Sequence, residues 1–250
     1  MSAARRSASL ALGSRLPRCL AAVCLAAGCF AVGCVDVYDG NGVPGEEVRG
    51  ESGFDQISAR GSLDVSVTQG AFGVRVAIDQ NLIQRVRTFV DDDTLVIDID
   101  GGNLGDHIDG PNVIVSMPTL RDVELNGSGR LAAEEFEEEE AVSVELAGRG
   151  ELSWSGSTPA LDVVLNGAGE LTLTGEATSV DYYLAGAGTL DAEALTARGA
   201  KLEVQGSGSI TATVDGRVDA TIDGSGSIEL FGSATEGTLD ISDEGTLTGL

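Results

Sequence analysis

The stretch Val163–Leu173, V-V-L-N-G-A-G-E-L-T-L, returns at a nearly fixed interval as far as the C-terminus. Its Gly-x-Gly triplet begins at six positions: Gly127, Gly148, Gly167, Gly186, Gly206 and Gly224. A degenerate seventh copy, Asp243-Glu244-Gly245, follows at the same interval. A nearly constant period of about 20 residues is typical of proteins built by stacking one structural unit on the next.

Apolar and polar residues alternate on both sides of each triplet. Around the triplet at Gly167 the apolar positions are Val163, Leu165 and Leu171, and the other copies carry apolar residues or Tyr at the same offsets. A period of two predicts β-strands with one buried face. The same parity places both glycines of a triplet on the inward side and the residue between them on the outward side.

The parity also limits how the chain turns at each triplet. A two-residue hairpin at Asn126-Gly127 would turn Leu131 outward, so we exclude it, whereas a three-residue hairpin loop keeps the parity and stays open. A constant length favours stacked coils, because each residue must lie on its counterpart one coil away. We therefore predict an all-β fold, a parallel β-solenoid with coils of about 19–20 residues. The paired glycines would form a tight corner, where a Cβ would crowd the interior or φ must be positive.

Charge is distributed unevenly along the chain. All 40 acidic residues lie beyond residue 34, and four of the 15 basic residues precede it, so the remainder has a net charge of 11 − 40 = −29. Such a chain should repel nucleic acid and anionic membrane surfaces, because binding to phosphates needs Lys and Arg. We expect no nucleic-acid partner.

Residues 1–34 read as a targeting segment. A basic start precedes a run of apolar and small residues, which is too short to span a bilayer comfortably and ends in Ala31-Val32-Gly33-Cys34. This end resembles a bacterial lipoprotein signal, in which the Cys is lipidated, so we predict Cys34 as the lipid attachment site. Cys29 is a second candidate, and an ordinary cleaved signal peptide is the alternative. All four cysteines lie in this segment, so we expect no disulfide framework beyond it.

Three further regions follow. We interpret residues 35–52 as a flexible tether because they are polar and rich in glycine. Residues 53–118 alternate strongly without the triplet, which indicates first coils and an N-terminal cap. Residues 119–250 carry the repeats, and the acidic run Glu134–Glu140 interrupts them as a solvated excursion.

The segment from about Phe54 to Leu250 resembles the GIN-domain family, the auto-transporter adhesin head domains of bacterial envelope proteins. The resemblance rests on Phe54-Asp55-Gln56-Ile57, on Val115-Ser116-Met117-Pro118-Thr119-Leu120 and on L-N-G-A-G-E-L at 165–171. It implies a single-chain, right-handed parallel β-helix and an exported protein. It implies no established activity.

The sequence contains no motif that is specific enough to indicate catalysis or a cofactor. A dinucleotide fingerprint needs a following helix, and calcium-binding rolls need a nine-residue period with a ladder of Asp, neither of which is present. Asp106-His107-Ile108-Asp109 holds the single His, which alone makes no metal site. We therefore predict no catalytic, cofactor-binding or metal-ligating residues. Trp154 and Tyr183 could stack on a sugar, but parity points Trp154 into the core and Tyr183 outward.

These observations predict an exported, lipid-anchored, non-enzymatic surface for adhesion or interaction at the outer membrane. Its contacts would come from outward rows of side chains such as Glu124, Glu145, Glu203 and Asp240. The partner would be an envelope or surface ligand, either protein or glycan. Two alternatives stay open: a polysaccharide-active enzyme, and a periplasmic structural or regulatory module.

Overall fold

The computed structural model of the chain describes residues 36–100, 102–104, 112–242 and 244–250. They belong to one compact unit that spans residues 35–250. Cys34 and His107 lie outside the described residues. Helical structure in the described part amounts to the short turn η1 (Ile83–Arg85). A membrane-crossing helix, with its long apolar run, is not found there.

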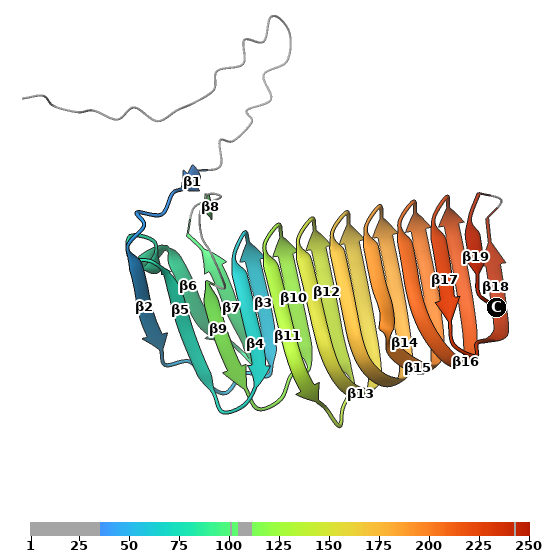
Figure 1. Ribbon diagram of the computed structural model, residues 1–250. Coiled ribbons are helices and arrows are strands. Elements are labelled where there is room, and N and C mark those ends of the chain that lie inside the picture. The colour runs from blue at the N-terminus through green and yellow to red at the C-terminus, as the bar shows by residue number, and fades with distance from the viewer. Residues whose placement is uncertain (1–35, 101, 105–111, 243) are drawn as a thin grey trace, which may run out of the picture. The chain divides into compact units, whose positions relative to one another are not determined.

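The repeat region forms coils stacked side by side (Figure 1). Its strands are β10 (Asp122–Gly127), β11 (Arg130–Glu137), β12 (Val142–Gly148), β13 (Glu151–Gly167), β14 (Glu170–Gly186), β15 (Thr189–Gly206), β16 (Ser209–Gly224), β17 (Ser227–Phe231), β18 (Thr235–Ile241) and β19 (Thr246–Thr248). Each coil pairs in parallel with the next, and equivalent residues are partners. The predicted parallel β-solenoid is confirmed, and the hairpin alternative is excluded, because antiparallel pairing would be required.

Each coil is flattened into two sheets joined by two kinds of corner. Sheet A contains the strands that run into a Gly-x-Gly triplet, and sheet B contains the strands that leave it. The triplets make the glycine corner, which is the upper edge in Figure 1. The bends that return the chain from sheet B to sheet A make the variable corner, at residues 155–160, 174–179, 193–199 and 213–217 in β13 to β16. The inward residues of both sheets form one continuous core.

The glycine corner explains why the triplets are invariant at two positions. The first glycine of each triplet has a φ between +121° and +148°, which L-residues rarely adopt. The second glycine is buried, and a Cβ on Gly169 would lie 2.6 Å from the carbonyl oxygen of Gly150 in the coil before. The backbone N–H of Ala168 donates to the carbonyl oxygen of Gly148 at 2.9 Å. The predicted outward position of the middle residues is confirmed by their exposure: Ser128, Arg149, Ala168, Ala187, Ser207 and Ser225.

One glycine corner was not visible in the spacing of the triplets. Strands β3 (Gln56–Gly61) and β4 (Asp64–Gln69) form a coil in register with the repeats, so Gly61-Ser62-Leu63 is its corner. Leu63 stands where later coils have their second glycine, and its side chain is 1% exposed. The preceding strand β7 (Thr94–Ile99) pairs with β3 only as far as Ala59. A side chain fits at Leu63 because the register places no earlier triplet beneath it.

Antiparallel pairing closes the N-terminal end of the coils. Strands β5 (Gly73–Asp79) and β9 (Val113–Met117) pair with each other, and β6 (Val86–Asp91) pairs with β7. Strand β9 ends directly before Pro118, which has no N–H to donate to a strand pairing. A separate two-stranded sheet joins β1 (Asp36–Tyr38) to β8 (Gly102–Leu104).

Part of the predicted tether is wrong. Pro44–Arg49 is strand β2, which pairs antiparallel with β5 along its whole length. The Arg49 guanidinium donates to the carbonyl oxygen of Ile83 at 3.3 Å, and Arg75 forms an ion pair with Glu46 at 3.5 Å. The strand covers an otherwise open sheet edge, where unpaired backbone groups are a liability. Its residues are exposed or half-buried, so the segment lacks the alternation of apolar residues that would predict a strand from the sequence.

Candidate functional site

The outer face of sheet A carries the row of side chains that the sequence predicts. Glu124, Glu145, Glu203 and Asp240 lie on one ladder, together with three residues that interrupt the acidic series: Val164, Tyr183 and Thr221. Neighbouring positions on such a ladder are about 4.8 Å apart. The backbone thus holds a partly acidic row at a regular spacing.

Carboxylates crowd together at the N-terminal end of this row. Ser58 donates to Oε2 of Glu124 at 2.8 Å. Burial raises the pKa of Asp122, although a hydrogen bond with Ser143 opposes the effect, and Glu124 adds to it. Burial also raises the pKa of Glu145, with Glu124 and Asp122 contributing repulsion. Within the described ranges, however, no group of three or more His, Cys, Asp or Glu is arranged to hold a metal ion.

The middle of the row contains its one aromatic side chain. Tyr183 is half-buried, and its hydroxyl donates to Oε1 of Gln205 at 3.0 Å. The amide of Gln205 in turn donates to Glu203 at 2.9 Å. Trp154 is 1% exposed, so the predicted inward and outward directions of these two aromatics are both confirmed. Trp154 cannot take part in a surface site.

The variable corner differs from sheet A because its register is irregular. Shifts in strand pairing occur between Ala133 and Phe136 in β11 and between Thr172 and Gly175 in β14. The pairing of β15 with β16 shifts twice, on either side of Thr196-Ala197. The unequal spacing of the triplets is therefore absorbed at this corner.

The acidic run Glu134–Glu140 is part of this corner. It is only partly an excursion from the coils, because β11 continues to Glu137 and Phe136 is fully buried. Glu135 is the bulged residue, with a φ of 60°. The carboxylate of Glu138 accepts a hydrogen bond from the backbone of Leu120 at 2.8 Å, whereas most of the other glutamates are exposed. The prediction of a solvated run holds for those side chains.

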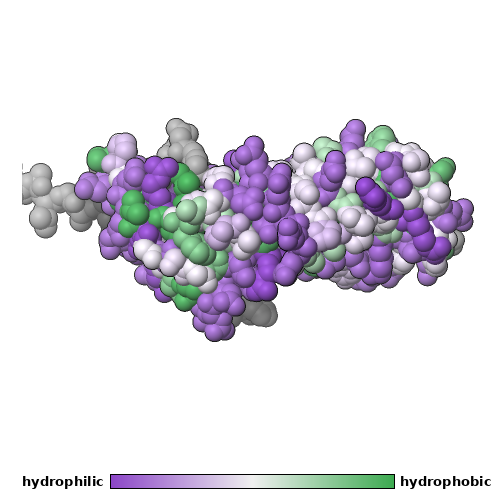
Figure 2. Space-filling view, turned by 90° about the horizontal axis from the view of Figure 1, so that it is seen from below, coloured by the Kyte–Doolittle hydropathy of each residue, from purple (hydrophilic) through white to green (hydrophobic). Residues whose placement is uncertain are grey.

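A hollow of about 420 Å³ lies on the variable corner over β13 to β16. We call it the corner hollow. Its outward-pointing lining is Ser157, Glu176, Thr178, Thr196, Arg198 and Asp215. Thr158 and Ala177 lie buried at its floor. Figure 2 views the molecule from this corner, where purple and white prevail over the repeats, whereas the strongest green patches lie at the N-terminal coils.

A second hollow, of about 520 Å³, lies further toward the N-terminus and is lined by Thr68, Gln69, Gly70, Ala71, Pro118 and Glu135. Gln69 is already engaged there. Its amide donates to the carbonyl oxygens of Pro118 and Glu137, and its own oxygen accepts from the N–H of Glu137. Gln69 is therefore not available to a ligand in this hollow.

Sequence reasoning did not find either hollow. The residues of the corner hollow are scattered over four strands, and each is an ordinary polar side chain in its own segment. The unequal spacing of the triplets was the one available signal, because it shows which coils differ in length but not where the difference falls.

The comparison that decides the family is with a model described as "Putative auto-transporter adhesin, head GIN domain", which matches residues 53–234. The chain belongs to this family. The predicted resemblance is thereby confirmed. No curated protein is similar enough in sequence to count as a match.

Solved structures support the same fold for this GIN-domain protein. A "putative adhesin" from Bacteroides fragilis has a TM-score of 0.74 at 22% identity, over 85% of this chain and 100% of its own. A "putative lipid binding protein" from Parabacteroides distasonis has a TM-score of 0.69 at 22% identity, over 86% of this chain and 100% of its own. A "putative adhesin" from Parabacteroides merdae has a TM-score of 0.60 at 21% identity, over 86% and 100% of the two chains. Identities this low establish the fold alone.

Proposed function

We propose that this protein is a lipid-anchored, non-enzymatic adhesin of the bacterial envelope, held at the outer membrane through Cys34. Membership of the GIN-domain family supports an adhesion-like role and an exported location. The observation that carries the proposal is the registered surface: parallel coils present side chains such as Glu124, Glu145 and Glu203 in rows that the backbone fixes.

Rows of this kind suit multivalent contact. Each contact is weak by itself, but a rigid array engages several at once without ordering flexible segments for each. The described surface offers no group of ligands for a metal ion, and the carboxylates of sheet A lie on an open face. The partner would be a protein or a glycan on a neighbouring surface.

The anchor and the orientation are tested together. Intact cells carrying a C-terminally tagged copy are treated with protease, beside cells that carry Cys34→Ser. We expect cleavage of the tag in intact cells, and release of the Cys34→Ser protein from the membrane fraction. Protection of the tag until the envelope is opened would contradict a surface adhesin and favour the periplasmic alternative. Unchanged fractionation and mobility of Cys34→Ser would place the anchor at Cys29 or remove it.

The non-enzymatic part has its own test. Soluble polysaccharides are incubated with the purified protein, and new reducing ends are measured. We expect none above the level of a heat-unfolded sample. Turnover that disappears with a single carboxylate substitution would overturn the proposal in favour of the polysaccharide-active enzyme.

A further inference from the structure

We infer that the corner hollow is a binding site for a neutral saccharide. This inference rests on the proposed function, because it names the ligand class that an adhesin of this shape would hold.

The lining is built from two outward positions of the coil. Ser157, Glu176 and Thr196 are partners on successive strands. The next outward position along the chain holds Thr178, Arg198 and Asp215. Neighbouring strands lie about 4.8 Å apart. The hollow thus brings six polar side chains from four coils within reach of one ligand.

These side chains combine complementary hydrogen-bonding roles. Ionised Glu176 and Asp215 only accept hydrogen bonds, Arg198 only donates, and the hydroxyls of Ser157, Thr178 and Thr196 do both. A sugar presents neighbouring hydroxyls that each donate and accept, so it needs both kinds of partner side by side. A volume of about 420 Å³ falls within the range of small-molecule sites.

The guanidinium of Arg198 is available to a ligand. It forms no ion pair with any residue in the described ranges, although most basic residues beyond residue 34 do. Asp215 is fixed in place, because its Oδ1 accepts hydrogen bonds from the backbone and the hydroxyl of Ser233 at 3.0 and 2.8 Å. These bonds hold the pKa of Asp215 below its usual range, so the second carboxylate oxygen stays a charged acceptor.

Charge and polarity exclude other ligand classes. Two carboxylates and one guanidinium give the hollow a net charge of −1. The part of the chain beyond residue 34, to which the hollow belongs, has a net charge of −29. A polyanion such as an acidic polysaccharide or a nucleic acid would be repelled. A lipid tail would strand the polar groups of the lining without partners, which costs free energy. A neutral, hydroxyl-rich molecule satisfies the lining without either penalty.

The position of the hollow supports a ligand-binding role. Register shifts in β14 and β15 border it, and the triplets that enclose these strands, at Gly167, Gly186 and Gly206, are unequally spaced. Bulges recur beside binding sites because they re-aim side chains, and length changes within repeats fall on loops that often form the binding face. The hollow thus lies where the coils depart from their regular path.

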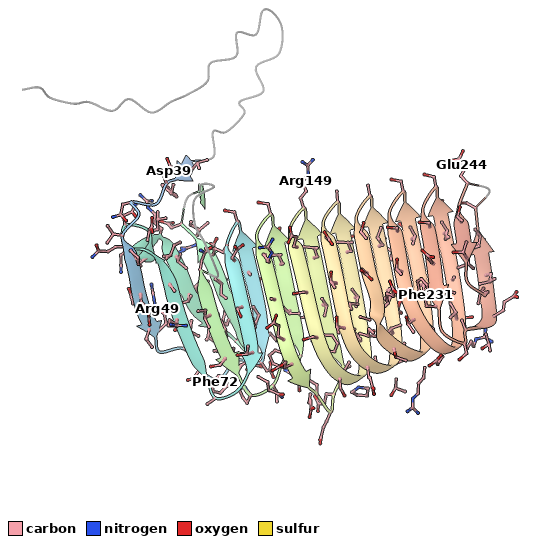
Figure 3. The ribbon with its side chains drawn as sticks, in the orientation of Figure 1. Asp39, Arg49, Phe72, Arg149, Phe231 and Glu244 are labelled. Carbon is pink, nitrogen blue, oxygen red and sulfur yellow. The ribbon has the colours of Figure 1, made fainter. Side chains whose placement is uncertain are left out.

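Isothermal titration tests the assignment with the purified protein and a set of probes. The probes are maltotetraose, cellotetraose, mannotetraose and N-acetylchitotetraose, with trigalacturonic acid as the acidic counterpart. Arg198→Gln and Glu176→Gln remove one donor and one acceptor. Arg149→Gln is the matched control, because this exposed arginine also lacks an ion pair in the described ranges but projects from the glycine corner (Figure 3).

We expect at least one neutral tetrasaccharide to bind, and we expect each hollow variant to weaken it at least tenfold, since hydrogen bonds to charged groups are among the strong ones. Arg149→Gln should bind like the unaltered protein, and thermal unfolding should show all variants folded. Tighter binding of trigalacturonic acid, binding that neither hollow variant changes, or no neutral saccharide bound would each overturn the inference.

Adhesion of whole cells separates this inference from the proposed function. If Arg198→Gln cells adhere as well as unaltered cells, the saccharide site is wrong while the adhesin stands. If unaltered cells do not adhere but the purified protein binds a tetrasaccharide through Arg198, the saccharide site stands and the adhesin is wrong.

Discussion

The two corners of the coil obey different rules. At the glycine corner, consecutive coils approach so closely that a Cβ on Gly167 would overlap the carbonyl oxygen of Gly148. At the variable corner the approach differs from one position to the next: a Cβ on Gly175 would overlap the carbonyl oxygen of Gly156, whereas a Cβ on Gly199 would have its nearest atom, the carbonyl oxygen of Arg217, at 3.7 Å. Backbone stacking fixes every triplet of the glycine corner, whereas the variable corner combines close stacking at some glycines with bulges and a hollow at other positions.

This difference explains how a strictly stacked fold can carry a variable surface. The glycine corner sets the register of every coil, because each triplet hydrogen-bonds to the one before it. With the register fixed there, the opposite corner can gain or lose residues, as β15 and β16 do, without displacing the core positions. Loops held by a rigid scaffold are where binding residues concentrate in proteins.

The largest effect is expected when the first corner is given the Gly-x-Gly sequence of the later corners. Leu63→Gly would turn Gly61-Ser62-Leu63 into Gly-x-Gly, yet we expect it to lower the free energy of unfolding by about 3–5 kcal/mol, because it deletes a fully buried side chain. Urea denaturation measures the loss. Ser128→Gly, at the exposed middle of the next corner, should cost less than about 1 kcal/mol. Similar stability of the two variants would show that Leu63 does not close the core.

A direct contrast between the corners comes next in size. Gly167→Ala should destabilise by about 2–4 kcal/mol, because an L-residue at a φ of +135° is strained and its Cβ overlaps a carbonyl oxygen. Gly199→Ala should change the free energy of unfolding by less than about 1 kcal/mol, since its φ is ordinary and space is free. Equal losses in urea denaturation would show that the approach of the neighbouring coil does not decide which glycines tolerate a side chain.

The glycine corner was predictable from the sequence, and the variable corner was not. Stacking requires nearly equal spacing and glycine at two positions, so the triplets from Gly127 to Gly224 predict the fold, its register and the inward direction of Trp154. The corner at Leu63 could not be predicted in this way, because the first coil has no triplet beneath it and therefore needs no second glycine. Strand β2 escaped because neither of its faces joins the core. The corner hollow arises from pairing between strands that no local pattern records.

A third variant tests whether the core between the corners depends on a single interaction, as the glycine corner does. The hydroxyl of Tyr182 is buried without a hydrogen-bond partner among the described residues, and burial raises its pKa. Tyr182→Phe should therefore stabilise the protein by about 1 kcal/mol, because an unsatisfied buried hydroxyl costs free energy. Thermal and urea unfolding measure the gain. A loss of stability would mean that the core, like the glycine corner, depends on an interaction at this atom.

The smallest expected effect concerns charge beside the variable corner. Arg217 and the backbone N–H of Thr238 donate hydrogen bonds to Asp219 and lower its pKa to about 2, whereas burial and Glu124 raise the pKa of Glu145 in sheet A. A lowered pKa contributes stability above the ordinary pKa of an Asp, about 3.9, and this stability is lost as the pH falls through about 2. A raised pKa acts in the opposite sense, so Glu145 disfavours the folded state at neutral pH and ceases to do so once it is protonated.

NMR titration of the carboxyl carbons should find the pKa of Asp219 below and that of Glu145 above their ordinary values. Arg217→Gln should raise the pKa of Asp219 while leaving that of Glu145 unchanged. A common pKa for both carboxyls would show that solvent screening erases the electrostatic difference between the corner and the sheet.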